Sequence, residues 1–141
     1  MCELTEKYKG KTFTGYKVVA RLGLEDDKNL YSIAMGTKYP NDGIIQKAIT
    51  QNRMMPYFNS DILKDPCTFR KNMVGRTAAF RDLYAADELK NKINGHGTFA
   101  PNQEINTEVW KVRLSKSLME GTYNHQEIVA GRHIKFLIKI E

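Results

Sequence analysis

Apolar and polar residues alternate over four short stretches of the chain, at residues 15–22, 30–36, 109–114 and 133–140. Alternation with a period of two turns one set of side chains to a core and the other to solvent, so each stretch is predicted to be a strand. Turn-forming residues 25–29 separate the first two, which predicts a hairpin. Residues 44–49 fit either a short strand or a single helical turn.

One helix is predicted at about residues 77–94. Apolar side chains recur there at intervals of three and four, which places them on one side of a helix. Thr77 is a suitable N-cap, and Gly95 can end the helix in the left-handed conformation. The stripe consists of Phe80, Leu83, Ala86, Leu89 and Ile93.

Strands followed by a helix and further strands predict an α+β fold, with a mainly antiparallel sheet of about five to six strands and the helix packed on one face. The 141 residues are expected to form a single domain, 1–141. The polar, lysine-rich residues 1–12 are predicted to be a flexible lead-in. Residues 50–75 show no period and are either a functional loop or a segment that the pattern does not assign.

The sequence contains no recognisable catalytic or metal-binding motif. Its two cysteines and three histidines lack the spacing of a metal site, and neither a nucleophile elbow nor a phosphate-binding glycine loop is present. We therefore assign no catalytic residue, metal or cofactor, and favour a binding protein over an enzyme. If the chain is an enzyme of unassigned type, the candidates are Arg76, Tyr16, Tyr31 and either Glu104 or Glu108.

The sequence also lacks the apolar segments of secreted and membrane proteins. No apolar run reaches the ~18–20 residues needed to span a bilayer. The first residues lack the apolar core of a signal peptide. We expect a cytoplasmic protein with reduced cysteines and no membrane partner.

The net charge of +6 is concentrated in one segment. Residues 53–81 contain six Lys or Arg and two Asp, so this segment contributes four of the six charges. Arginine binds phosphate through two parallel hydrogen bonds, and a helix start favours anions. We predict an anion-binding site here; the alternative is an ordinary helix start with surface arginines. The site residues would be Arg53, Arg70, Arg76, Thr77 and Arg81.

A second group of cations lies on the polar faces of the predicted strands. They would form one basic patch if those strands are neighbours, but the alternative is an ordinary solvated sheet face. Tyr16, Tyr31, Trp110 and Phe136 are predicted on the opposite, buried face, which disfavours a base-stacking surface. The cations are Lys17, Arg21, Lys111, Arg113, Arg132, Lys135 and Lys139.

Four apolar residues of the unassigned segment are candidates for binding a protein. Methionines adapt to different partners, and flat aromatic side chains are common in interfaces. The alternative is a loop folded back over the core. The residues are Met54, Met55, Tyr57 and Phe58.

The layout of the chain resembles small phage-encoded accessory proteins. The resemblance rests on residues 15–19, 31–32, 75–86, 109–112 and 134–140. It implies expression in the host cytoplasm and a non-enzymatic role in binding and blocking a host protein, such as a defence factor. Two alternatives stay open: a module that binds or sequesters a nucleotide signal or nucleic acid through the arginine cluster, and a minor virion component.

Overall fold

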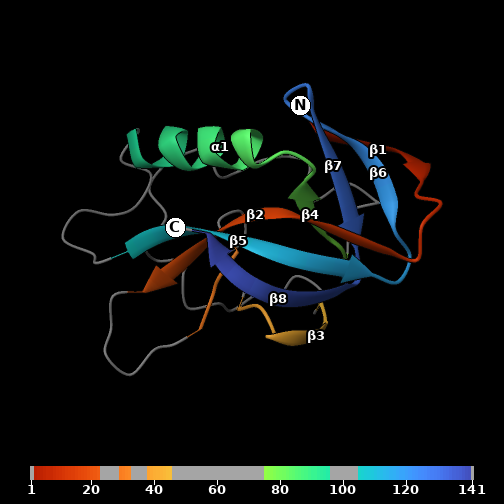
Figure 1. Cartoon of the computed structure of the whole chain (residues 1–141), viewed down its shortest axis with the longest axis horizontal. Coiled ribbons are helices and arrows are strands. Elements are labelled where there is room, and N and C mark those ends of the chain that lie inside the picture. Colours follow the sequence, from red (N-terminus) through yellow and green to blue (C-terminus); the bar gives the residue numbers. More distant parts are fainter. Residues whose placement is uncertain (1, 23–28, 33–37, 46–74, 96–104, 141) are drawn as a thin grey trace.

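A computed structural model describes residues 2–22, 29–32, 38–45, 75–95 and 105–140 of the chain. It confirms the α+β class, because a mainly antiparallel sheet carries one helix, α1 (Leu83–Gly95) (Figure 1). The strands are β1 (Cys2–Lys7), β2 (Thr12–Leu22), β3 (Asp42–Ile44), β4 (Thr77–Phe80), β5 (Ile105–Ser115), β6 (Met119–Tyr123), β7 (Gln126–Gly131) and β8 (His133–Ile140).

The sheet has eight strands in the order β1-β6-β7-β4-β2-β5-β8-β3, so the prediction of five to six strands was too low. The strands β3 and β4 are only three and four residues long, too short to show a period. In β7, residues 128–131 are all buried, so no alternation marks that strand. The expected lead-in contains β1, which pairs antiparallel with β6.

The helix begins six residues later than predicted. Residues 77–80 form β4, which pairs with residues 128–131 of β7. The N-cap is Asp82, whose Oδ1 accepts a hydrogen bond of 3.0 Å from the backbone N–H of Tyr84. Phe80 nevertheless packs in the same apolar cluster as Ala86, because the strand leads directly into the helix.

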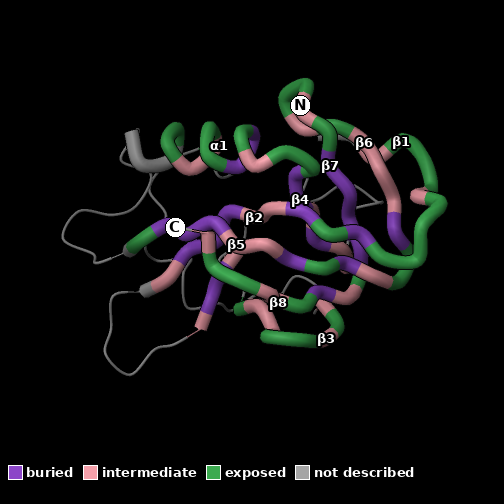
Figure 2. The backbone as a smooth tube through the Cα atoms, viewed as in Figure 1, coloured by how far each residue is buried: buried purple, intermediate pink, exposed green. Residues whose placement is uncertain are grey.

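The longest strands, β2 and β5, are adjacent and contain many of the buried residues (Figure 2). These residues belong to two clusters on opposite faces of the sheet. On the α1 side, Val18 and Val109 form a core cluster with helix residues. On the opposite side, Phe13, Val112 and Leu114 form a second cluster. The sheet therefore separates two cores, with α1 over one of them.

The register between β2 and β5 contradicts the prediction that Tyr16, Trp110 and Phe136 lie on one face of the sheet. Lys17 is the Cα partner of Trp110, and Tyr16 is the partner of Lys111. Trp110 and Phe136 therefore lie on the same face as Lys17, opposite α1, while Tyr16 lies on the α1 side. Both faces of each strand carry apolar residues, so the alternation within one strand does not show which of its faces lies on the same side of the sheet as a given face of the next strand. Within the described residues, no helix combines the length and hydropathy needed to cross a membrane.

Candidate anion-binding surface

Strands β2, β5 and β8 are neighbours, as the basic-patch hypothesis requires, but their cations divide between two faces. Arg113 is the Cα partner of both Thr14 and Lys135, which places these residues and Lys111 on the α1 side. Lys17, Arg21 and Lys139 belong to the opposite side. The single predicted patch is therefore two separate groups, whose environments differ.

On the side opposite α1, the carboxylate of Glu108 holds two of the three cations. Its Oε2 lies 2.8 Å from Arg21 Nε and 3.6 Å from Lys139 Nζ, and its Oε1 accepts a hydrogen bond of 2.9 Å from Trp110 Nε1. Burial alone would raise the pKa of this carboxyl. The hydrogen bonds from Arg21 and Trp110 and the positive charges of Arg21 and Lys139 outweigh burial, so its pKa is lowered. Glu108 is therefore an ionised structural group rather than a proton donor.

The third cation on this side, Lys17, is also held internally. Its Nζ donates a hydrogen bond of 2.6 Å to the carbonyl of Ala78 and lies 5.3 Å from the centre of the Tyr39 ring. That ring contacts Phe136, which in turn contacts Trp110, with centroid distances of 5.7 Å in both cases. The cations and aromatic rings of this side thus form a connected structural layer.

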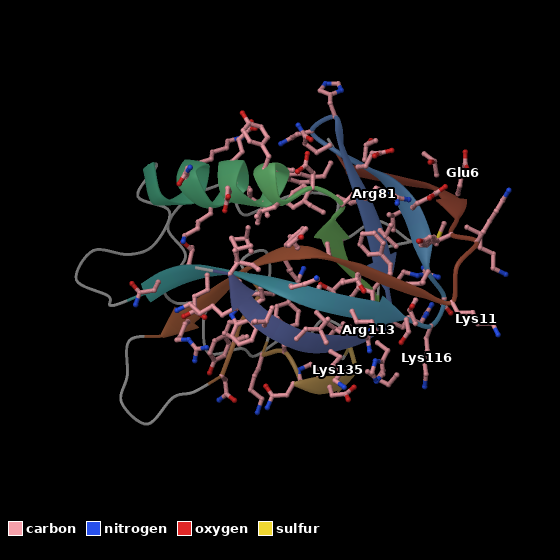
Figure 3. The ribbon with its side chains drawn as sticks, viewed as in Figure 1. Glu6, Lys11, Arg81, Arg113, Lys116 and Lys135 are labelled. Carbon is pink, nitrogen blue, oxygen red and sulfur yellow. The ribbon has the colours of Figure 1, made fainter. Side chains whose placement is uncertain are left out.

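The α1 side differs, because Arg113 and Lys135 are exposed and Lys111 is partly exposed, away from the part of the sheet that α1 covers (Figure 3). The helix packs at the end of β2 and β5 marked by Val18 and Val109. The cations lie toward the other end, where Thr12 is paired with Ser115. These three cations, together with two lysines just beyond the paired ends of β2 and β5, are called the basic face: Lys11, Lys111, Arg113, Lys116 and Lys135.

Arg113 and Lys135 form the centre of the basic face. They lie directly opposite each other on β5 and β8, and both are exposed. Within the described residues, no carboxylate forms a salt bridge with any cation of the basic face. Asp42 is the Cα partner of Lys135 on its other side, but its carboxylate lies 3.1 Å from His133 Nε2. Like charges directly opposite each other destabilise a sheet, so the direct pairing of Arg113 with Lys135 is not expected to stabilise the fold.

A pair of like charges elsewhere in the sheet shows the contrast. Glu6 and Glu120 are Cα partners on β1 and β6. Here Arg81 supplies a counter-charge, with its Nη2 3.0 Å from Glu120 Oε2. Figure 3 shows Arg81 and Glu6 well away from the basic face. One member of the acidic pair therefore has an ion-pair partner, whereas no salt bridge of the described residues involves Arg113 or Lys135.

The described part of the predicted arginine site is not brought together. Arg76 and Arg81 lie at opposite ends of β4, where Arg76 Nε donates a hydrogen bond of 2.8 Å to the carbonyl of Ser117. Arg81 is held by Glu120, and its guanidinium lies 5.6 Å and 5.5 Å from the rings of Tyr8 and Phe13. Thr77 is buried, and its hydroxyl lies 3.2 Å from that of Tyr39, so it caps no helix.

The other predicted site residues lie outside the described residues. These are Arg53 and Arg70 of the anion site and Met54, Met55, Tyr57 and Phe58 of the protein-binding segment. Blocking of a host protein therefore stays a prediction. The enzyme candidates Tyr16 and Glu108 lie on opposite faces of the sheet, so they do not form one site.

The sequence pattern marks neither Lys11 nor Lys116 as a site residue. Both lie in connections between strands, where a lysine carries no periodic signal. They join the basic face because the β2–β5 ladder ends at Thr12 and Ser115, which brings the residues beyond it together.

The chain matches no family model, no curated protein and no solved structure.

Proposed function

We propose that the protein binds nucleic acid through contacts between the basic face and the phosphate backbone. The observation that carries this proposal is the exposed Arg113–Lys135 pair, with which no carboxylate of the described residues forms a salt bridge. A bound phosphate would relieve the repulsion within the pair. Clustered Lys and Arg on one surface also release counter-ions from nucleic acid on binding, which favours association.

The shape of the basic face suits a polymer better than a single small anion. Lys111 and Arg113 follow one another along β5, and residues on the same side of a strand repeat at about 6.6 Å. Lys116 and Lys11 extend the row beyond the end of that strand. Several phosphates in succession can therefore be contacted by one strand and its following turn.

The same surface favours binding that is independent of base sequence. On the α1 side of β2, β5 and β8, Tyr16 is the described aromatic residue nearest to these cations, since it is the Cα partner of Lys111. Its side chain is only partly exposed. Recognition of single-stranded bases commonly uses exposed aromatic rings. Contacts to the backbone position a nucleic acid without reading its sequence.

A binding measurement with matched charge variants tests the proposal. Fluorescence anisotropy would measure the affinity for a labelled duplex and for single strands of unrelated sequence. The Arg113→Gln/Lys135→Gln variant should bind at least about tenfold more weakly, since two charge-assisted contacts are lost. The control variant, Lys90→Gln/Lys92→Gln, removes the same charge from α1 and should bind like the wild type. If both variants lost the same amount of affinity, binding would depend only on the net charge of the protein, which would contradict binding through the basic face.

A further inference from the structure

A second pair of cations lies next to the basic face, at the turn between β5 and β6. The backbone N–H of Arg132 donates a hydrogen bond of 3.0 Å to the carbonyl of Lys116. Arg76 Nε donates one of 2.8 Å to the carbonyl of Ser117. Two arginines from distant parts of the sequence are thus tied to consecutive residues of one turn.

Gly75 brings the side chains of these arginines together. Its φ is +78°, a conformation that favours glycine. A Cβ at this position would lie 3.2 Å from Arg132 Nη1, so the guanidinium of Arg132 lies against the backbone just before Arg76. Burial, together with the positive charge of Arg132, lowers the pKa of Arg76. The guanidinium of Arg132 thus lies against the residue that precedes Arg76, and its positive charge disfavours the charged form of Arg76.

The described residues do not neutralise Arg132. Its side chain is exposed and forms no salt bridge within the part of the chain that the structure describes. Two neighbouring guanidinium groups present several N–H donors in fixed planes, a geometry that matches the oxygens of a phosphate group. A terminal phosphate group has several unesterified oxygens, which can accept hydrogen bonds from both guanidinium groups.

We propose that Arg76 and Arg132 form a binding site for a phosphomonoester group. Two sources share this chemistry: the terminal phosphate of a nucleic-acid strand, and a free phosphate or mononucleotide. The first source rests on the proposed function, because Lys116 belongs to the basic face and its carbonyl accepts the hydrogen bond from Arg132. The second source does not depend on it.

The site itself is tested with inorganic phosphate at constant ionic strength. NMR of the arginine Nε–H groups should show saturable shifts at Arg76 and Arg132 that are larger than those with chloride. Arg132→Gln should remove the saturable shift of Arg76, and Arg132→Lys should weaken it, because a lysine keeps the charge but loses the planar donors. Lys92→Gln is the control and should leave both shifts unchanged.

Gly75→Ala provides a variant that retains both arginines. The added Cβ should displace Arg132 and weaken phosphate binding several-fold, and the NMR spectrum reports directly whether the variant is folded. Absence of a saturable shift in the wild-type protein, or an unchanged Arg76 shift in Arg132→Gln, would overturn the site.

Oligonucleotides distinguish the two sources. If the terminal phosphate is the ligand, wild-type protein should bind a 5′-phosphorylated strand several-fold more tightly than the same strand with a 5′-hydroxyl, and Arg132→Gln should remove this preference. Saturable phosphate binding without such a preference would support the site and assign it to a free phosphate. If no oligonucleotide binds, the proposed function fails, whereas the phosphate titration still decides the site.

Discussion

Glu108 is the ion-pair partner of two cations on one side of the sheet. Its carboxylate holds Arg21 and Lys139 on the side opposite α1. On the α1 side, Arg113 and Lys135 face each other without such a carboxylate among the described residues. Residue types alone do not reveal this difference, because both groups consist of Lys and Arg at alternating positions. Among the described residues, Arg21 and Lys139 have an ion-pair partner, whereas no salt bridge involves Arg113 or Lys135.

We predict that Glu108→Gln lowers the free energy of unfolding by about 2 kcal/mol at pH 7, because the charged hydrogen bonds from Arg21 would be lost. Glu108 has a lowered pKa in the folded protein, so its ionised carboxylate stabilises the fold fully when the pH is above 4.5, the ordinary pKa. This stabilisation is lost as the pH falls through the lower pKa of the folded protein. Urea unfolding at several pH values measures the difference between variant and wild type. A difference that stays constant down to pH 2 would contradict this role.

Arg113→Gln should have the opposite effect on stability. Removing one of two opposed like charges should leave the free energy of unfolding unchanged or raise it by up to about 1 kcal/mol at low salt. Thermal unfolding at low and high ionic strength measures this, and any gain should shrink as salt screens the repulsion. A clear loss of stability would mean that Arg113 serves the fold.

At the level of elements, the junction of β2 and β4 depends on Gly15. A Cβ there would lie 2.5 Å from the carbonyl oxygen of Phe80 and 2.5 Å from Cε2 of Phe13. The register between these strands is given by Tyr16 and Phe80, directly beside this close approach. A side chain at residue 15 would push apart the strands that connect the two parts of the sheet.

Gly15→Ala is therefore expected to lower the free energy of unfolding by about 2–3 kcal/mol, since the backbone oxygen cannot move aside. Gly10→Ala is the control, because its Cβ would have no neighbour closer than 3.3 Å, and it should change stability much less. Chemical unfolding followed by Trp110 fluorescence compares the two. Equal effects would argue against the close approach at Gly15.

The start of α1 provides a second test at this level. Asp82→Ala should lower the free energy of unfolding by about 1 kcal/mol, while Asp82→Asn should retain most of the stability, because asparagine also caps helices. Unfolding followed by circular dichroism measures both. If Asp82→Ala had no effect, the helix would not depend on this cap.

The elements differ in how far the sequence predicts them. Alternation predicted β2, β5 and β8 because each has long, regular strand patterns. It did not predict β4, because Phe80 lies three residues before Leu83 and so fits a helical stripe as well as the end of a strand. In β7, burial of residues 128–131 on both faces removes the alternation on which such predictions depend.

For the whole molecule, the sequence predicts an excess of positive charge but not the surface that presents it. The net charge of +6 follows from composition, and residues 53–81 account for most of it. The basic face arises elsewhere, because the pairing of β5 with β8 places Arg113 opposite Lys135, and the β2–β5 ladder ends beside Lys11 and Lys116. Such pairing depends on long-range register, which the pattern within a single strand does not determine.

The salt dependence of nucleic-acid affinity tests the central proposal most directly. With five phosphate contacts on a duplex, the logarithm of the association constant should fall with the logarithm of salt concentration with a slope of about −4 to −4.5. Arg113→Gln/Lys135→Gln should make this slope shallower by about 2, and Lys90→Gln/Lys92→Gln should leave it unchanged. A wild-type slope near zero, or one that the Arg113→Gln/Lys135→Gln variant does not alter, would contradict binding through the basic face.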